Sequence, residues 1–168
     1  MELLDFFTGK WLNTVDAKGR VSVPAPIRKV IAARMGEPDA KAAKALMLAK
    51  HERDQCMQGF DKSYLALAYQ DMRAQQKADV EHGRPADSRF VRSGSLFGST
   101  EDIAIDGSGR IILPPGLRRR AAITDGALFV GTGETFEIWS PEAALQSMDR
   151  PDIREFAEEL IAEREGRL

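Results

Sequence analysis

The chain has 168 residues, of which 43% are hydrophobic and 30% charged, and its formal net charge is −2. These proportions are typical of a globular protein and exclude an intrinsically disordered chain, and no run approaches the roughly 18 uninterrupted apolar residues of a membrane span. The acidic amino-terminus is unlike a signal peptide, and the single cysteine, Cys56, has no partner for an internal disulfide. We therefore expect a cytoplasmic protein without a membrane partner.

The first elements are two strands around a tight turn. Residues 6–15 alternate loosely between apolar and polar, which predicts a half-buried strand. Residues 16–19 follow as a turn, in which Gly19 is free to adopt a positive φ. Residues 20–23 then predict the return strand, with its two valines on one side.

A helix is predicted next, because Pro24 and Pro26 end the strand and suit a first helical turn. Apolar residues at positions 27, 30 and 31 have helical spacing, and Gly36 would end the helix. Residues 39–45 are small and basic and have no counterpart later in the chain. We interpret them as an insertion that either extends the helix or forms a loop.

Two strands, at residues 45–49 and 56–60, lead into a longer helix over 62–81, with Asp61 as its N-cap. Residues 83–89 form the expected boundary. Beyond them, residues 90–97 predict a short helix.

The rest of the chain repeats the pattern of strand, turn, strand, helix, strand, hairpin and strand. Residues 132–134 would form the tip of the last hairpin, and Ser140 the N-cap of another helix. Apolar positions between 153 and 161 make the carboxy-terminal helix amphipathic, with a polar side rich in glutamate. Its apolar side must cover either its own core or a neighbouring subunit.

An internal duplication explains this order. Residues 15–24 (VDAKGRVSVP) recur 90 positions later as residues 105–114 (IDGSGRIILP). A period this long indicates two small domains rather than a solenoid. We therefore expect a first repeat at 6–66, a helix and linker at 67–91, a second repeat at 92–143 and the amphipathic helix at 144–168. Identical pairs at this offset are Phe7/Phe97, Asp16/Asp106, Gly19/Gly109, Arg20/Arg110, Pro24/Pro114, Arg28/Arg118 and Ala32/Ala122.

The charge is unevenly distributed over these segments. Residues 1–66 carry 11 Lys or Arg against 8 Asp or Glu, whereas residues 92–143 carry 5 against 7 and residues 144–168 carry 4 against 7. A local basic face matters more for binding a polyanion than net charge does. The first repeat is thus the better candidate for contact with nucleic acid, although +3 over 66 residues is also within ordinary scatter.

The repeated Asp and Arg suggest two roles. The carboxylate can accept backbone N–H groups of the turn and pair with the arginine, which would fix the shape of the loop. The guanidinium also suits phosphate oxygens and the O6/N7 edge of guanine. Both roles can hold together, and the pattern alone also permits a purely structural one.

These residues resemble the tandem SpoVT-AbrB repeats of the MraZ family of bacterial transcriptional regulators. Phe97-Gly98, Leu117-Arg118 and residues 136–139 (FEIW) add to the resemblance, which covers roughly residues 6–143. It implies an α+β, mainly β fold: a duplicated AbrB-type swapped-hairpin β-barrel formed by two intramolecular repeats, with flanking helices. It also implies a homo-oligomeric ring, association with the nucleoid, and binding to double-stranded DNA, as a repressor, at short direct repeats upstream of the division and cell-wall gene cluster.

The resemblance makes Arg20 and Arg110 the motif arginines, and Asp16 and Asp106 the motif aspartates. We expect Lys18 and Arg20 to enter a groove or straddle phosphates, with backbone contacts from other basic side chains. The insertion at 39–45, the degraded strand at 56–60 and Ser108 in place of Lys18 depart from the family pattern and make the two turns unequal. The expected DNA-binding residues are Lys10, Lys18, Arg20, Arg28, Lys29, Arg110 and Arg118, and the loop-structuring residues are Asp16, Gly19, Asp106 and Gly109.

No catalytic constellation is found, so we expect neither an enzyme, nor a cofactor, nor a small-molecule substrate. His51 and His82 form no metal-ligand pattern with Cys56 and are interpreted as solvated surface histidines. The Gly-x-Gly fragments at 107–109 and 131–133 suit hairpin tips better than nucleotide sites. The remaining alternative to a DNA-binding regulator is an AbrB-like protein-binding module of antitoxin type, whose acidic carboxy-terminal segment engages another protein.

Overall fold

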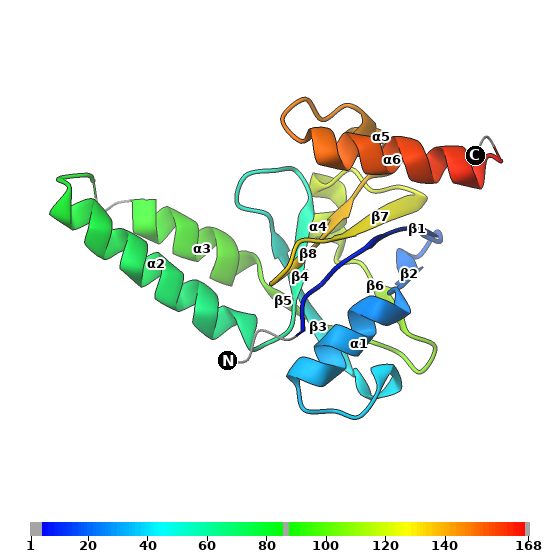
Figure 1. Ribbon diagram of the computed structural model, residues 1–168, viewed down its shortest axis with the longest axis horizontal. Coiled ribbons are helices and arrows are strands. Elements are labelled where there is room, and N and C mark those ends of the chain that lie inside the picture. Colours follow the sequence, from blue (N-terminus) through cyan, green and yellow to red (C-terminus); the bar gives the residue numbers. More distant parts are fainter. Residues whose placement is uncertain (1–4, 86–87, 167–168) are drawn as a thin grey trace.

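The computed structural model describes residues 5–85 and 88–166. It is an α+β structure with a six-stranded antiparallel sheet, a separate two-stranded ribbon and helices on both sides (Figure 1). The first half of the chain contains β1 (Lys10–Thr14), β2 (Arg20–Ser22), α1 (Ala25–Arg34), the 3₁₀ helix η1 (Ala40–Ala42), β3 (Ala45–Lys50), β4 (Met57–Phe60) and α2 (Tyr64–Glu81). The second half contains α3 (Ser88–Ser99), β5 (Glu101–Ala104), β6 (Arg110–Ile112), α4 (Pro115–Arg120), β7 (Gly126–Gly131), β8 (Phe136–Trp139), α5 (Pro141–Leu145) and α6 (Pro151–Arg164).

Strands from the two halves are interleaved in the six-stranded sheet. The sheet order is β1-β7-β8-β4-β3-β5, so β1 pairs with β7, β4 with β8 and β3 with β5 across the halves. Only β3–β4 and β7–β8 are pairs within one half. The β2–β6 ribbon also joins the halves, with Val21 opposite Ile111. The repeated units therefore share their hydrogen-bonded ladders.

The closed barrel implied by the family resemblance is not found among the described residues. The six-stranded sheet keeps two edges, β1 and β5, and the ribbon is a separate sheet. The ribbon separates from the six-stranded sheet at the Asp–Arg turns. At the first turn the Asp16 N–H donates to the Arg20 carbonyl, and β2 then pairs with β6 alone. The mainly antiparallel α+β class is thus confirmed, while the ladder does not close on itself.

The two faces of the sheet are buried by different elements, as the period-2 alternation of the strands requires. One face packs on the ribbon, α1 and α4 through a core that includes Phe7, Ile27, Ile111, Phe129 and Phe136. Over β7 and β8 the other face is covered by α5 and α6, and over β3 and β4 by α2 and α3. The apolar side of α6 therefore covers the chain's own sheet.

The helices α2 and α3 form a hairpin, here called the arm, that extends away from the body on the left of Figure 1. Near the sheet, Ala68, Met72 and Leu96 are buried against Ala49 and Phe60. The helix α3 is longer than the predicted 90–97. Residues 86 and 87, within the expected boundary at 83–89, lie outside the described residues.

The start of α2 differs from the prediction. The helix begins at Tyr64, so Asp61 lies before the N-cap position, which Ser63 occupies without a side-chain cap. Asp61 Oδ2 accepts the Ser63 N–H at 3.1 Å, and Asp61 Oδ1 lies 2.7 Å from Arg34 Nη1. Asp61 is 1% exposed. The ion pair with Arg34 thus holds this buried carboxylate away from the cap geometry.

The insertion at 39–45 takes the loop form of its two predicted alternatives. Residues 40–42 make one 3₁₀ turn, in which the N–H groups of Lys41 and Ala42 donate to the Asp39 carboxylate at 3.0 and 3.2 Å. The turn is thus closed by its own cap, and α1 ends before it at Arg34.

Candidate nucleic-acid interface

In the first turn, the Asp16 carboxylate organises the backbone. Its Oδ1 accepts the N–H groups of Lys18 at 2.9 Å and Arg20 at 2.8 Å, and its Oδ2 accepts Arg20 Nε at 2.7 Å. Gly19 completes the turn at φ +82°, which a side chain would disfavour. The Arg20 guanidinium is therefore anchored through Nε, which leaves its two terminal nitrogens available for other contacts.

The second turn has the same geometry with a looser arginine. Asp106 Oδ1 accepts the N–H groups of Ser108 at 2.8 Å and Arg110 at 3.0 Å, while Arg110 Nε is 3.3 Å from Oδ2. The hydrogen bonds from backbone N–H groups, chiefly those of Arg20 and Arg110, lower the pKa of both aspartates. Both carboxylates are therefore ionised at neutral pH, as an anchor for a guanidinium requires.

The ribbon holds the two turns together. The Leu113 N–H donates to the Gly19 carbonyl and the Val23 N–H to the Gly109 carbonyl, both at 2.9 Å. Val21 and Ile111 point into the core, so Arg20 and Arg110 lie on the opposite, accessible face of the ribbon. In an antiparallel pair such diagonal positions are about 7–8 Å apart. The duplication thus produces one surface with two motif arginines.

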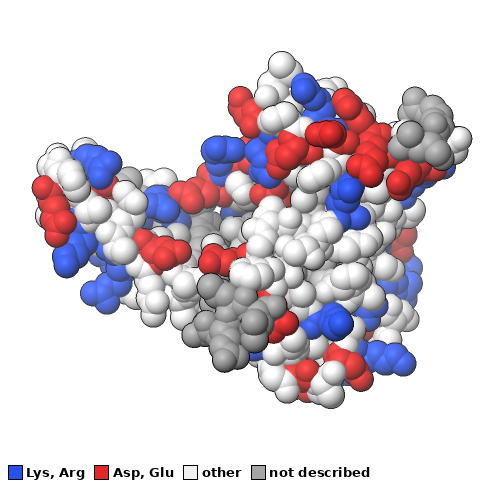
Figure 2. All heavy atoms as spheres, viewed as in Figure 1, with Lys and Arg blue, Asp and Glu red and all other residues white. Residues whose placement is uncertain are grey.

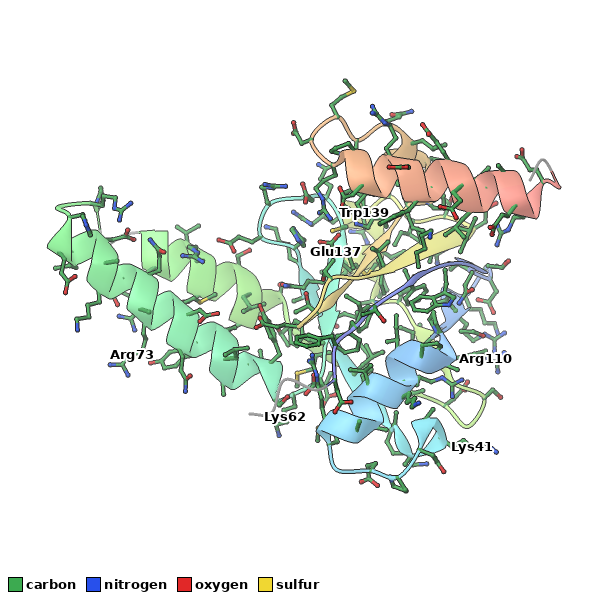
Figure 3. All side chains as sticks on the ribbon, viewed as in Figure 1. Lys41, Lys62, Arg73, Arg110, Glu137 and Trp139 are labelled. Atoms are coloured by element: carbon green, nitrogen blue, oxygen red, sulfur yellow. The ribbon has the colours of Figure 1, made fainter. Side chains whose placement is uncertain are left out.

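Each helix arginine lies against the turn of the other half. Arg118 Nε and Nη2 donate to the carbonyls of Ile123 and Thr124, and a Cβ on Gly19 would come within 3.0 Å of Arg118 Nη1. Arg28 Nε donates to the Val23 carbonyl, and a Cβ on Gly109 would lie 2.6 Å from the Arg28 guanidinium carbon. Both glycines therefore have a positive φ and lie in close contact with an arginine of the other half. Figure 3 shows Arg110 beside α1.

A groove of about 310 Å³ lies between the first turn and α4. Its charged lining residues are Lys18, Arg118 and Arg119, and its floor is apolar, with Ile112 and Leu113 among its residues. No acidic side chain is among these lining residues. Arg119 was missed by the sequence analysis, although the 90-residue offset would have paired it with Lys29.

Of the expected DNA-binding residues, only Lys18 and Arg118 line this groove, and two others contact different parts of the surface. Lys10 Nζ is 3.5 Å from Glu159 and 5.1 Å from the centre of the Phe156 ring, so Lys10 contacts α6. Lys29 is exposed on α1, beside a separate hollow that Phe6 and Val30 also line. The structure therefore brings Lys18, Arg20, Arg28, Arg110 and Arg118 to the ribbon and its flanking helices, but not Lys10.

Away from the ribbon, a buried ion-pair network corrects the interpretation of His51 as a solvated histidine. His51 Nδ1 accepts the backbone N–H groups of Arg53 and Asp54, and Nε2 lies 3.0 Å from Glu137 Oε2. Arg150 binds Glu137 and Asp54 at 3.0 and 2.8 Å. His82, in contrast, is exposed.

The same network brings together ligand atoms of His51, Cys56 and Glu137, all within 4.8 Å of one another. The donor set fits a metal poorly, because Nδ1 is occupied by backbone N–H groups and the Glu137 carboxylate by Arg150, His51 and Trp139. Burial also raises the pKa of the Cys56 thiol, which favours the neutral form. We interpret this cluster as structural.

The electrostatics of Glu137 show what holds the network. Burial favours the neutral acid, but hydrogen bonds from His51, Arg150 and Trp139 outweigh it and lower the pKa of Glu137 to about 2. The Trp139 indole donates to Oε1 at 2.9 Å, and Figure 3 shows both side chains between the sheet and α6. The network therefore connects β8, the β3–β4 loop and the start of α6.

Across the described residues, every helix is too short or too polar to cross a membrane.

The chain is similar in sequence to known proteins of one family. A family model described as the MraZ protein, and as antitoxin-like, matches residues 96–149. The transcriptional regulator MraZ of Gluconacetobacter diazotrophicus is 32% identical over 98% of this chain and 96% of its own length. The MraZ regulators of Azorhizobium caulinodans and Rickettsia akari are 33% and 31% identical, each over 83% of this chain and over 80% and 84% of their own lengths. A likeness that extends over almost the whole chain shows that it belongs to the MraZ family.

Proposed function

We propose that the chain is a sequence-specific regulator of transcription that binds double-stranded DNA through the β2–β6 ribbon. The observation that carries this proposal is the pairing of the two Asp–Arg turns on one face, with Arg20 and Arg110 each anchored by an aspartate. A guanidinium held through Nε presents its remaining donors in a fixed direction, which suits phosphate oxygens or guanine. The two SpoVT-AbrB repeats, residues 6–66 and 92–143, would then act as one reading surface.

The basic side chains around the ribbon would have different roles in binding DNA. Lys18 and Arg119 are exposed and line the cationic groove, where a phosphate can be held by charge. Arg28 and Arg118 donate to backbone carbonyls and so support the turns while adding positive charge. Arg20 and Arg110 are the candidates for reading base edges. Because Lys18 has Ser108 as its counterpart, the first turn binds phosphate more strongly than the second.

A single ribbon is too small to select a promoter. Non-specific contacts alone give a Kd of about 10⁻⁴–10⁻⁶ M at physiological salt. In a homo-oligomeric ring, several ribbons would contact consecutive direct repeats, and avidity can add about 10²–10⁴-fold. We propose that this is how the chain represses the division and cell-wall gene cluster from its promoter and stays with the nucleoid. The linker at 67–91 and the helix at 144–168 would flank this reading unit.

The test is promoter binding measured across salt concentrations. Arg20→Ala should weaken binding and lower the slope of log Kd against log salt by about 1 if Arg20 contacts a phosphate. Arg20→Lys keeps the charge but not the paired donors, so it should preserve the slope and lose discrimination between operator and random DNA. Arg110→Ala reports the second turn. Lys41→Ala, on the exposed insertion, is the matched control. The proposal would be refuted if Arg20→Ala left affinity and slope unchanged and Arg20→Lys kept the native discrimination between operator and random DNA.

An antitoxin-like role in binding another protein is the second candidate. It is favoured by the description of the matching family model and by the acidic surface over α6, visible at the top of Figure 2. This role would be supported instead if a partner protein co-purified in stoichiometric amount only when α6 is present, and if neither the native chain nor any variant retarded promoter DNA. Promoter retardation by the purified chain alone would exclude it as the sole function.

A further inference from the structure

The outward face of the β2–β6 ribbon is not symmetric, although the ribbon joins two copies of one repeat. Four side chains alternate with the buried ones and point away from the core: Arg20 and Ser22 from β2, and Arg110 and Ile112 from β6. In the register, Arg20 stands directly opposite Ile112, and Arg110 stands directly opposite Ser22. The two arginines correspond at the 90-residue offset, but Ile112 corresponds to Ser22. Each arginine therefore has a different neighbour.

Ile112 is 58% exposed, although it is apolar. A single exposed apolar side chain is ordinary on a protein surface. The position of Ile112 is not ordinary, because it lines the cationic groove together with Lys18, Arg118 and Arg119. It also faces Arg20, and opposite Cβ atoms in an antiparallel pair are about 4.5–5.5 Å apart. An apolar side chain thus lies within the cationic surface, next to an arginine that is a candidate for reading a base.

The charges divide the ribbon face in the same way. The flanking helices match, because each carries two basic residues at the equivalent positions, 118 and 119 on α4 and 28 and 29 on α1. The turns differ, because Lys18 in the first corresponds to Ser108 in the second. The hydrogen bond that anchors the arginine is also shorter in the first turn, at 2.7 Å against 3.3 Å. One half of the face therefore combines an extra cation with an apolar side chain, whereas the other half has two hydroxyl groups in their place.

Isoleucine and serine recognise different base edges. The major groove of DNA admits a two-stranded β-ribbon, and each base pair presents a distinct pattern there. Thymine alone carries a C5 methyl group, which apolar side chains contact, whereas a serine hydroxyl can donate to or accept from several bases. Bases along a strand are about 3.4 Å apart, so Ile112 would reach a base within one or two steps of the base that Arg20 contacts. An isoleucine beside a guanidinium thus suits a thymine close to a guanine.

We propose that Ile112 is a specificity-determining residue that contacts the C5 methyl group of a thymine in the major groove, and that the difference between Ile112 and Ser22 gives the ribbon a fixed direction on DNA. This inference rests on the proposed binding of DNA by the ribbon. A symmetric ribbon would bind its site equally well in both directions. The unequal ribbon distinguishes the two ends of each site, which agrees with direct repeats rather than inverted ones.

The first test removes one methyl group from the DNA. Short random duplexes selected on the native chain supply the probe, and each thymine of the selected sequence is then replaced by deoxyuridine, which lacks only the C5 methyl group. At one position the replacement should weaken binding of the native chain about three- to fivefold, the effect of one buried apolar carbon. Ile112→Ala should bind the two duplexes equally. Ser22→Ala, on the other half of the face, is the matched control and should keep the native preference for thymine.

The second test makes the ribbon symmetric. The double variant Ser22→Ile/Ser108→Lys copies the side chains of the first half onto the second. Two further duplexes are built by inverting either half of the selected site onto itself. The native chain should prefer the original site to both, whereas the double variant should prefer the symmetric duplex built from the half that contains the thymine. Positions 22 and 108 are exposed, so thermal unfolding of the double variant should match that of the native chain.

The inference is overturned if every deoxyuridine replacement affects the native chain and Ile112→Ala alike, if Ser22→Ala loses the preference for thymine as Ile112→Ala does, or if the double variant still prefers the original site. Failure of the proposed function gives a different pattern. The native chain would then select no sequence, or Arg20→Ala would bind the selected sequence as tightly as the native chain. Either result would remove the ribbon as a reader of DNA, and the role of Ile112 with it.

Discussion

The stability of this protein should depend on pH through one buried carboxylate, Glu137, which can be tested by Glu137→Gln. The pKa of Glu137 falls from its ordinary value of 4.5 to about 2 in the folded chain. A group whose pKa is lowered by folding stabilises the fold above its unfolded pKa. This contribution is lost as the pH falls from about 4.5 towards about 2. The shift corresponds to about 3 kcal/mol at neutral pH, as an order of magnitude.

Urea unfolding of the native and Glu137→Gln chains between pH 7 and pH 2.5 measures this contribution. The variant should be less stable by about 3 kcal/mol at pH 7, and the difference should shrink progressively below pH 4.5. Glu159→Gln is the control, since its carboxylate is exposed and pairs with Lys10 at the surface, where a pair is worth about 0–1 kcal/mol. A difference between native and Glu137→Gln that stays constant down to pH 2.5 would refute this account of the network.

Three further substitutions test the packing. Gly59→Ala should destabilise the fold by about 1–3 kcal/mol in urea unfolding, because its Cβ would lie 2.2 Å from the ring of Phe136; an unchanged midpoint would contradict this. Asp61→Asn removes the buried charge that pairs with Arg34 and should cost about 3–5 kcal/mol by the same measurement, and a loss under 1 kcal/mol would be inconsistent with burial of the pair. Gly109→Ala should lower both stability and promoter affinity, because Gly109 has a φ of +79° and lies close to the Arg28 guanidinium. A Cβ on Gly107, in the same turn, would meet no described atom within 4 Å, so Gly107→Ala should change neither.

The local structure could be read from the sequence because local patterns determine it. Asp16 and Gly19 produce the turn by short-range hydrogen bonds and backbone freedom, and the same residues reappear 90 positions later with the same result. Proline at the start of α1 and Ser140 at the start of α5 predicted both helices. The predicted strand at 127–131 forms within β7, whose continuous apolar run is buried on both faces of the sheet, with Phe129 in one core and Leu128 and Val130 in the other.

The exchange of strands between the halves could not be read in the same way. A repeat shows that two segments fold alike, but it does not show whether β2 pairs within its own half or with β6. The placement of Arg28 against Gly109 depends on that pairing. His51 and Glu137 are likewise 86 positions apart, and only the β4–β8 ladder brings them together. Long-range pairing therefore decided the parts of the site that the sequence analysis missed.

The interleaved ladder also determines when this protein can begin to fold. During synthesis the chain must hold β1 unpaired until β7 leaves the ribosome, because Lys10 has its partner at Val130. Contacts this distant in sequence slow folding, and an unpaired strand edge invites association with other chains in the meantime. Neither half is a complete folding unit. If the chain is divided into two polypeptides between α2 and α3, each should consequently be unfolded alone, and the sheet should form only when the two are mixed.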